Sequence, residues 1–335
     1  MPALAVADAL KTEGAQVAFV GGERAEAELV PAAGYELHRL DVAPLPRRRP
    51  VAAARAALTD ARAVRAASAL LRRIGADVAL GAGGYVAAPL GVAATITRVP
   101  LMLMEADSHL GLANRILAPL ARRVFLAFPI DGRTGDRYLL TGRPVPPPAT
   151  DRDAARARFG ISPGETCVVV FGGSLGARSI NRAAVDAFAG ARFRVLHAAG
   201  HRDMPDLRSP GPHYDLRPYI ENFGEALLAG DLVVARAGGS IFELAAHGRP
   251  AVLIPYPYAT GDHQTENARW MEQAGAAVVV PDAELTPARL AQEVGRLLAD
   301  PARLASMAHA SASLARPDAA RTIASEVLAV GRRGT

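Results

Sequence analysis

Cysteine is almost absent from this chain of 335 residues. Cys167 is the only one, and it lies in the apolar run from Cys167 to Phe171. A disulfide framework and a cysteine metal site are therefore both excluded, and a reduced cytoplasmic setting fits. The first residues, from Met1 to Gly14, contain no basic segment followed by a long apolar core, so we predict no signal peptide there.

Long apolar runs are also missing. The one charge-free stretch that is long enough to consider as a membrane span, Val78 to Thr97, contains four glycines and one proline. These residues divide it into a strand, a turn and a short helix. We therefore predict no transmembrane span.

Lysine is nearly absent, because 37 of the 38 basic residues are arginine and only Lys11 is lysine. With abundant Ala, Gly and Pro, this is typical of codon bias, so the net charge of +5 does not by itself indicate a polyanion-binding protein, and we predict no nucleic-acid partner. Residues 1–150 carry 18 basic and 13 acidic side chains, whereas residues 151–335 carry 20 of each. The positive half could meet an anionic membrane or an acidic substrate, or it could be an ordinary solvated surface.

Short β-type runs alternate with helix-type stretches along the whole chain. The predicted strands are Val17–Val20, Val78–Leu80, Leu101–Met104, Val124–Ala127, Cys167–Phe171, Val195–His197, Leu232–Ala235, Ala251–Ile254 and Ala277–Val280. Such alternation predicts parallel sheets with crossover helices. Four prolines between Pro144 and Pro148 interrupt it once, and we place an interdomain linker there. We predict an α/β fold of two doubly wound domains, residues 1–145 and 146–317, with a last helix at about 318–335 that packs back on the first domain.

Three glycine turns follow predicted strands. Their members are Gly83 and Gly84, then Gly172, Gly173 and Gly176, and finally Gly238 and Gly239. Glycine lets backbone N–H groups approach a diphosphate closely, although any tight strand-to-helix turn also favours glycine. A dinucleotide site would need an acidic residue about twenty positions after Gly172, and the strand that ends at His197 has none there. A phosphate-binding Gly-x-x-x-x-Gly-Lys motif is absent as well.

The segment from Asp231 to Asn267 combines a strand, a glycine turn, a helix start, a second strand and an amide cluster. Helix N-termini at the carboxyl ends of parallel strands favour phosphate groups, and neutral amides suit a sugar. Ser240 and Glu243 have the spacing of a capping box, and Glu243 is also a candidate acceptor for ribose hydroxyls. His263 is either a sugar contact or a surface residue. The scattered histidines and acidic residues predict no metal site.

These motifs resemble the MurG family of peptidoglycan glycosyltransferases. The resemblance covers nearly the whole length and depends on seven segments: GAGGYVAAPLGVAA (81–94), 105–117 with GLANRIL, TGRPV (141–145), FGGSLGARSIN (171–181), RPYI (217–220), RAGGSIFELAAHGRPAVLIPYP (236–257) and DHQTENA (262–268). It implies a GT-B type fold, in which two Rossmann-like domains face each other across a cleft. The acceptor lipid would bind the N-terminal domain and UDP-N-acetylglucosamine (UDP-GlcNAc) the C-terminal domain.

The resemblance also implies an activity, a location and a set of site residues. The activity is inverting, metal-independent and cofactor-free transfer of N-acetylglucosamine to the lipid-linked muramyl-pentapeptide, lipid I, at the inner face of the cytoplasmic membrane. Without a metal, helix dipoles and glycine-loop N–H groups would stabilise the leaving UDP. The matching donor-site residues are Asn114, Ser174, Ile220, Gly239, Ser240, Ile241, Glu243, Gln264 and Asn267.

Some positions depart from the family pattern. The family begins with a strand and a GGTGGH-type loop whose histidine is the favoured general base, and this chain opens at Met1 just beyond that loop. We therefore expect the chain as written to lack a central strand and to be poorly active. The loop from Gly238 is one residue shorter than usual. Glu105, Asp107 and His109 are candidates to assist proton transfer, and none of them is preferred.

Two other hypotheses stay open. One is a donor-binding module that holds a UDP-sugar without turnover, and the other is a nicotinamide-dependent oxidoreductase, which the missing acidic ribose partner disfavours.

Overall fold

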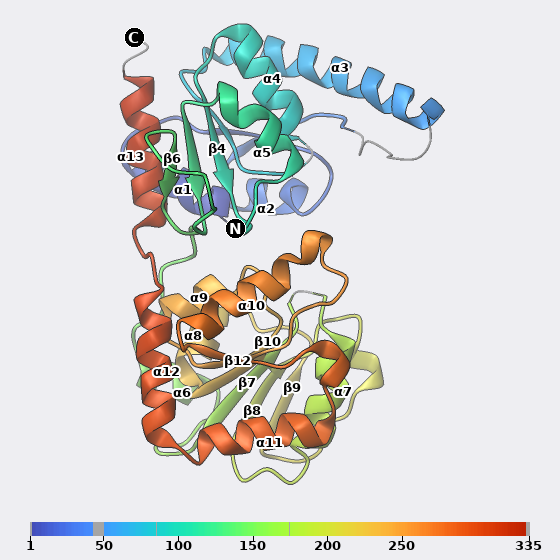
Figure 1. Ribbon diagram of the computed structural model, residues 1–335, viewed down its shortest axis with the longest axis vertical. Coiled ribbons are helices and arrows are strands. Elements are labelled where there is room, and N and C mark those ends of the chain that lie inside the picture. The colour runs from blue at the N-terminus through green and yellow to red at the C-terminus, as the bar shows by residue number, and fades with distance from the viewer. Residues whose placement is uncertain (1, 43–49, 85, 174, 333–335) are drawn as a thin grey trace. The chain divides into compact units, whose positions relative to one another are not determined.

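The computed structural model describes residues 2–42, 50–84, 86–173 and 175–332 (Figure 1). The chain divides into two compact units. The first comprises Met1–Val145 and Arg316–Thr335, and the second comprises Pro146–Ala315. The chain thus enters the second unit within the proline-rich segment and leaves it after helix α12 (Pro301–Ser313).

The first unit contains two groups of parallel strands. In one group β1 (Ala18–Gly21) pairs with β2 (Glu36–Arg39). The other group follows the order β3 (Ala79–Gly81), β4 (Leu101–Glu105), β5 (Arg123–Leu126) and β6 (Tyr138–Leu140). Within the described residues these groups form two separate sheets.

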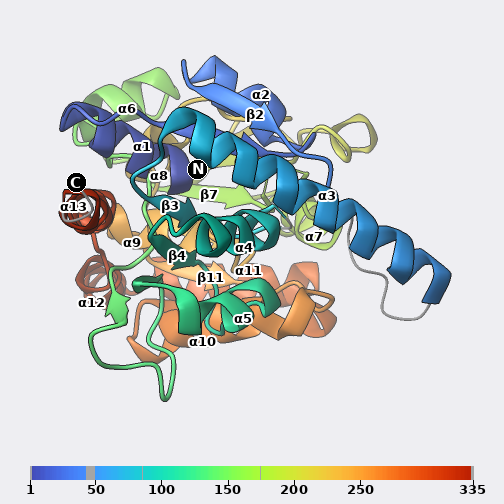
Figure 2. The ribbon, with the colours of Figure 1, turned by 90° about the horizontal axis from the view of Figure 1, so that it is seen from above.

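Two sets of helices cover the larger sheet of the first unit. One set is α1 (Pro2–Thr12) with α13 (Ala319–Gly331). The other set is α3 (Pro50–Ile74), α4 (Ala87–Thr97) and α5 (Leu112–Leu117), which lie side by side in Figure 2. Helix α2 (Glu26–Ala32) packs on the smaller sheet, against β1 and β2. Successive side chains of β4 alternate between these sets, so Met102 packs with α1 and α13, whereas Leu103 packs with the other set. An ion pair of 3.2 Å between Arg123 and Glu326 ties α13 to β5.

The second unit is a doubly wound domain with one parallel sheet of six strands. Their order across the sheet is β12 (Ala277–Val279), β11 (Ala251–Leu253), β10 (Leu232–Ala235), β7 (Cys167–Phe171), β8 (Arg194–Ala198) and β9 (Tyr214–Arg217). Its helices are α6 (Arg152–Arg158), α7 (Arg178–Ala187), α8 (Phe223–Ala229), α9 (Ile241–Ala246), α10 (His263–Gln273), α11 (Pro287–Leu298) and α12. The predicted fold class of two Rossmann-like α/β domains is therefore confirmed.

The middle strand β7 is apolar on both faces, as a central parallel strand must be when helices cover both sides. Val168 and Val170 belong to the core with α7 and α11. Phe171 points to the opposite face, where its ring meets Phe223 of α8 edge-on at 4.8 Å. Every residue of β7 is buried. Burial raises the pKa of the Cys167 thiol to about 12, which leaves this cysteine as an unreactive core residue.

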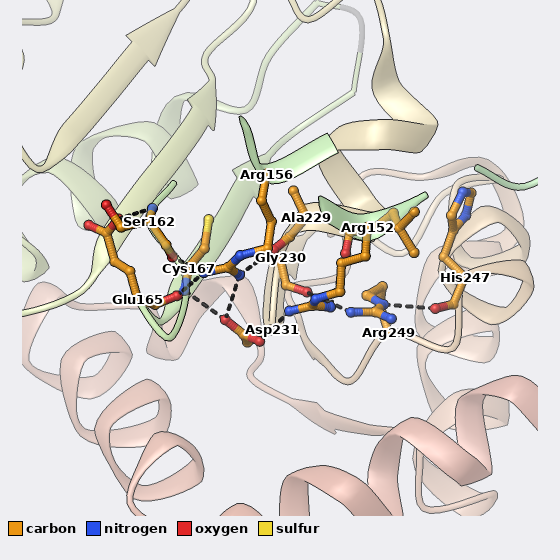
Figure 3. Close-up of polar contacts among 11 residues, drawn as sticks. Arg152, Arg156, Ser162, Glu165, Cys167, Ala229, Gly230, Asp231, His247 and Arg249 are labelled. Atoms are coloured by element: carbon orange, nitrogen blue, oxygen red, sulfur yellow. Dashed lines mark hydrogen bonds and ion pairs between the residues drawn. The ribbon is translucent and has the colours of Figure 1, made fainter. Parts of the chain in front are cut away.

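A polar cluster fixes the amino-terminal edge of this sheet (Figure 3). Asp231 accepts hydrogen bonds from the backbone N–H of Cys167 at 2.8 Å and from Arg152 at 2.6 Å. Arg156 donates to the Ala229 carbonyl and Arg249 to the Gly230 carbonyl, so α6 and the start of β11 are anchored together. Because ligands of open parallel sheets bind at the opposite edge, this arginine-rich cluster is structural.

Candidate functional site

The strand order of the second unit places two glycine loops next to each other. From β7 the chain proceeds outward to β8 and β9, and then returns to place β10 on the other side of β7. Phe171 and Ala235, the last residues of β7 and β10, are paired in register. The loops that follow them therefore leave the sheet side by side at its topological switch point, which is the usual ligand position in open α/β sheets.

The loop after β7 requires glycine for two physical reasons. Gly173 and Gly176 have φ angles of +97° and +78°, a region that side chains with a Cβ rarely adopt. A Cβ on Gly176 would lie 2.0 Å from the carbonyl oxygen of Ala199, and one on Gly172 would lie 2.3 Å from the backbone nitrogen of Ala177. The glycines therefore leave the backbone of this loop accessible, and they allow it to pack closely against Ala177 and Ala199. Ser174, the predicted phosphate-loop serine, lies outside the described residues.

A buried polar network supports this loop from beneath. Asn181 donates to the Ala199 carbonyl at 2.8 Å, and its side-chain oxygen lies 3.0 Å from Nε2 of His197. The other ring nitrogen of His197 lies 2.7 Å from the Tyr214 hydroxyl. Burial lowers the pKa of His197 to about 3, so the ring is neutral near pH 7. His197 and His201 are four residues apart, a spacing that would suit two ligands of one metal ion. Both ring nitrogens of His197 already have hydrogen-bond partners, so His197 is not available as a metal ligand.

A buried arginine organises the loops after β10 and β11. Arg236 follows β10 directly and contacts the Asp282 carboxylate at 2.6 Å. It also donates to the carbonyls of Ile254 and Pro255, both at 3.1 Å, and to the Ser179 hydroxyl at 2.9 Å. One guanidinium thus joins the ends of two strands, the start of α7 and the segment before α11. The sequence analysis did not identify Arg236 as a residue that organises the site. The only signal for it in the sequence was a basic residue immediately after an apolar strand.

The predicted capping box at the start of α9 does not form. Ser240 is the N-cap residue, but its backbone is already α-helical and its side chain makes no capping hydrogen bond. Since the N-cap residue normally has an extended backbone, the helical backbone of Ser240 accounts for the missing cap. Gly238, Gly239 and Ser240 are partly exposed, as is Glu243, whereas Ile241 is buried.

The two predicted amides lie next to the Gly238 loop. The side-chain oxygen of Gln264 accepts a hydrogen bond from the backbone N–H of Tyr256 at 3.0 Å, and its side-chain nitrogen lies 3.8 Å from where a Cβ on Gly238 would be. Asn267 donates to the Ala237 carbonyl at 2.9 Å. Its side-chain oxygen is buried and has no hydrogen-bond partner among the described residues. That acceptor is available to a hydroxyl or N–H donor.

The remaining predicted donor residues divide between the two units. Ile220 is buried just after β9, at the same carboxyl edge as the glycine loops. Gly83 and Gly84 follow β3 in the first unit, with φ angles of +88° and +77°. Asn114 also belongs to the first unit, on α5, and its side-chain oxygen is buried without a partner among the residues described.

Glu105 orders the loop that precedes α5. Its carboxylate accepts hydrogen bonds from the backbone N–H of Gly111 at 2.8 Å, the Asn114 amide at 2.9 Å and the backbone N–H of Asp107 at 3.2 Å. A carboxylate with three internal donors holds its surroundings in place, so Glu105 is a positioning residue. Of the three candidates for proton transfer, Asp107 is partly exposed and His109 is exposed.

A resident metal ion has no evident ligand set in the part of the chain that the structure describes, since no three His, Cys, Asp or Glu residues there converge. Neutralisation of a phosphate at this edge would come from backbone N–H groups, helix N-termini and arginine side chains.

Both units match known families. The Glycosyltransferase family 28 N-terminal domain matches residues 1–126, and the Glycosyltransferase family 28 C-terminal domain matches residues 167–323. These two matches define the class of a chain that has two parallel-sheet domains and paired glycine loops at the switch point of the second: the protein is a glycosyltransferase of family 28.

Individual relatives narrow the class. A UDP-N-acetylglucosamine–N-acetylmuramyl-(pentapeptide) pyrophosphoryl-undecaprenol N-acetylglucosamine transferase of Mycolicibacterium paratuberculosis is 41% identical, over 99% of this chain and 86% of the relative. One of Rubrobacter xylanophilus is 40% identical, over 98% of this chain and 100% of the relative. The crystal structure of Acinetobacter baumannii MurG has a TM-score of 0.80 and 26% identity, and the match covers 98% of this chain and 95% of that one. The chain belongs to the MurG family.

Proposed function

We propose that this chain transfers N-acetylglucosamine from UDP-GlcNAc to the undecaprenyl-diphosphate-linked muramyl-pentapeptide, with inversion at the anomeric carbon and without a metal ion. The relatives bear this activity in their names. The observation that carries the proposal is the juxtaposition of the Gly172–Gly176 and Gly238–Ser240 loops at the switch point of the second sheet. This is the position at which a nucleotide diphosphate is bound in open α/β sheets.

The proposed donor-site roles are those that the resemblance to the MurG family implies. The backbone of Ile220 would meet the uracil, and Glu243 would accept hydrogen bonds from the ribose hydroxyls. The loops around Gly173 and Gly239 would donate backbone N–H groups to the diphosphate, with Ser174, Ser240 and Ile241 beside it. Gln264 and Asn267 would bind the sugar hydroxyls, and the unpartnered oxygen of Asn267 supports that role.

The reaction requires two kinds of assistance. An acceptor hydroxyl attacks the anomeric carbon while the bond to the UDP oxygen breaks, so negative charge grows on the diphosphate and a proton leaves the acceptor. Backbone N–H groups that are already aligned stabilise the growing charge without reorganisation. Asn114, held by Glu105 on the first unit, would contact the donor sugar. We assign no general base among these residues.

We further propose that the first unit docks on the inner face of the cytoplasmic membrane. Helices α4 and α5 pack against each other. These two helices and the 3-10 turn that follows α5 carry five exposed apolar side chains: Val92, Ile96, Leu112, Ile116 and Leu120. The first four form two pairs at i,i+4 spacing. Exposed Arg115 and Arg122 lie close by in sequence and would attract anionic lipids. Among the helices within the described ranges, none combines the length and apolarity that crossing a membrane requires.

A turnover assay tests the proposal. The purified chain is incubated with UDP-GlcNAc and a lipid I analogue in EDTA, and UDP release and the product are quantified. We expect turnover in EDTA that depends on both substrates, even if it is slow. Calorimetry on the same sample measures UDP-GlcNAc affinity. Binding that requires magnesium or manganese would contradict the metal-independent mechanism.

Two further outcomes separate the alternatives. UDP-GlcNAc binding with no detectable product would favour a donor-binding module. Thermal stabilisation by NAD but not by UDP-GlcNAc would favour an oxidoreductase. Against the latter, no acidic side chain follows β8 before His201 to hold a ribose.

A further inference from the structure

His247, the C-cap residue of α9, joins this helix to the segment by which the chain enters the second unit. Its ring nitrogen Nε2 lies 3.1 Å from the backbone nitrogen of Ala149, and Nδ1 lies 2.8 Å from the carbonyl oxygen of Glu243. A backbone N–H can only donate and a carbonyl can only accept, so Nε2 carries no proton and Nδ1 carries one. The ring is therefore neutral and has one tautomer while both hydrogen bonds are made.

The N–H group that His247 accepts is the first one in this segment. Residues 146–148 are all proline and have no backbone N–H, so Ala149 is the first residue of the second unit that can donate from its main chain. Helix α6 begins only after its N-cap residue, Asp151. The hydrogen bond between Nε2 of His247 and Ala149, called the His247 clamp below, thus fixes the entering segment ahead of the first helix.

The start of α8 encloses the His247 clamp from a third side. A Cβ on Gly224 would lie 3.2 Å from Nε2 of His247 and 3.9 Å from the backbone nitrogen of Ala149. The first distance is shorter than an ordinary van der Waals contact, so glycine allows α8 to lie directly against the hydrogen bond. All three residues are partly buried. A hydrogen bond in such surroundings is stronger than one in open water.

The other end of the connecting segment is fixed within the first unit. The backbone N–H groups of Thr141 and Gly142 both donate to the carbonyl of Leu126, the last residue of β5, at 3.0 and 3.1 Å. A Cβ on Gly142 would lie 2.5 Å from Cβ of Arg316, so the outgoing and returning segments pack closely there. Residues 143–148 lie between this anchor and the His247 clamp, and four of them are proline. Prolines make such a connection stiff.

Charged side chains stand on the elements around the ring. The Arg249 guanidinium donates to the backbone carbonyl of His247 at 2.7 Å, and Arg152 of α6 lies beside that guanidinium (Figure 3). Glu225 of α8 is paired with an arginine of α6, and Glu243 lies one turn earlier on α9. Burial lowers the pKa of His247, the hydrogen bond to the Glu243 carbonyl raises it, and the Arg249 charge lowers it further. The folded ring is therefore neutral at pH 7 and binds a proton only in more acidic solution.

We propose that His247 is a positioning residue for the transfer reaction, because its neutral ring holds Ala149 and keeps the connection between the units short. This inference rests on the proposed function, in which a donor on the second unit meets an acceptor held by the first. A protonated Nε2 is a donor and cannot accept from Ala149, so acid opens the His247 clamp. The unanchored segment then extends to Asp151, and the two substrates meet less often in the reactive geometry.

Hydrogen exchange at the Ala149 amide measures the His247 clamp independently of activity. It is followed on the full chain at pH 7.5 and pH 5 and expressed as a protection factor, which removes the intrinsic effect of pH on exchange. The unaltered chain should lose at least threefold of this protection at pH 5. His247→Leu, which has no acceptor, should lack about tenfold of it at both pH values. His247→Gln, whose amide oxygen can replace Nε2 and does not titrate, should keep it at both.

Steady-state kinetics on the same chains test the link to the reaction. At pH 7.5 we expect His247→Leu to lower kcat at least threefold and to leave the KM for UDP-GlcNAc unchanged, because the donor binds the second unit alone. From pH 7.5 to pH 5 the unaltered chain should lose at least threefold more kcat than His247→Gln. His309→Gln, at an exposed position of α12, is the control and should follow the unaltered chain throughout.

Several outcomes would overturn the proposal. They are equal protection of Ala149 in His247→Leu and the unaltered chain, an equal loss of protection by His247→Gln in acid, and a loss of protection without a change in kcat. A change in KM alone would place the effect of His247 in the donor site and would overturn it too. If His247→Leu does not fold, the comparison of His247→Gln with the unaltered chain decides. Absence of turnover in every chain would contradict the proposed transfer reaction, and the protection factors would then decide the His247 clamp.

Discussion

The guanidinium of Arg236 lies 2.6 Å from the carboxylate of Asp282, and both side chains are largely buried. Through this pair, the residue that follows β10 is fixed to the segment that follows β12. The same guanidinium binds the carbonyls at the end of β11. The loops that would cradle a diphosphate thus depend on one ion pair, whose partners are 46 residues apart.

Removal of the acidic partner should disturb both stability and donor binding. Asp282→Ala leaves the Arg236 charge uncompensated in a low-dielectric environment, which costs about 3 kcal/mol. We expect the free energy of unfolding to fall by that amount in denaturant titrations, and the KM for UDP-GlcNAc to rise about tenfold. Asp318→Ala, which breaks an exposed ion pair with Arg321 on α13, is the control and should alter neither quantity measurably.

Substitution of Gly176 should disable the loop after β7. Gly176→Ala places a Cβ 2.0 Å from the Ala199 carbonyl oxygen at a φ of +78°, so the loop must move. We expect the affinity for UDP, measured by calorimetry, to fall at least tenfold. Gly190→Ala is the matched control, because a Cβ there meets nothing within 4 Å and φ is not positive. A Gly176→Ala variant with unchanged affinity would argue against a phosphate at this loop.

Much of the fold was predictable from apolar runs. All nine predicted strands are present within a residue or two of their expected ends, and the last helix is α13. Three strands were not predicted: β2, β6 and β9. Each lies at the end of its sheet. End strands need no continuous apolar run because one edge, and often one face, contacts solvent, and the β2 side chains Glu36 and Arg39 are indeed exposed.

The site was predictable only where backbone geometry dictates residue type. Glycine is required where φ is positive or where backbone segments come close, so the tight glycine loops after β7 and β10 could be predicted, whereas their binding of a phosphate stays a prediction. The Arg236–Asp282 pair could not, since nothing local relates residues so far apart in sequence. The capping box at Ser240 was predicted and is wrong, because the spacing of Ser240 and Glu243 does not determine the backbone angles at the N-cap.

Glu243 should contribute to ribose binding through its charge. Glu243→Gln preserves the size of the side chain and changes mainly its charge and its strength as a hydrogen-bond acceptor. No capping hydrogen bond of the Ser240 side chain is lost in this variant, because none is present. A hydrogen bond to a charged group contributes about 1.5–3 kcal/mol, so we expect UDP affinity to fall by about tenfold or more. Glu266→Gln, on the exposed face of α10, serves as the control. Unchanged UDP affinity in Glu243→Gln would show that the ribose role is wrong.

The exposed apolar side chains of α4 and α5 should govern membrane binding. Ile96→Asp with Ile116→Asp replaces two exposed apolar side chains by charges, which opposes insertion and repels anionic lipid. In sedimentation with vesicles that contain anionic lipid, we expect binding to fall at least tenfold while the Tm stays within about 2 °C, as is usual for surface substitutions. Tyr258→Asp, at an exposed position of the second unit, is the control. Binding by the unaltered chain should also weaken as salt rises, and insensitivity to salt would exclude an electrostatic share.

The buried His197 should make the protein less stable in acid. Its pKa is about 3 in the folded chain, because burial disfavours the charged ring, and it is about 6.5 in an unfolded chain. Below pH 6.5 the unfolded state therefore binds a proton that the folded state does not, and stability falls as the pH falls. From pH 7 to pH 5 this one group lowers the free energy of unfolding by about 2 kcal/mol. Denaturant titrations at both pH values should show that His197→Gln, although less stable at pH 7, loses about 2 kcal/mol less on acidification than the unaltered chain. His201→Gln, at an exposed position just beyond the strand, should show the full loss. If His197→Gln were as acid-sensitive as the unaltered chain, protonation of this ring would not be the cause.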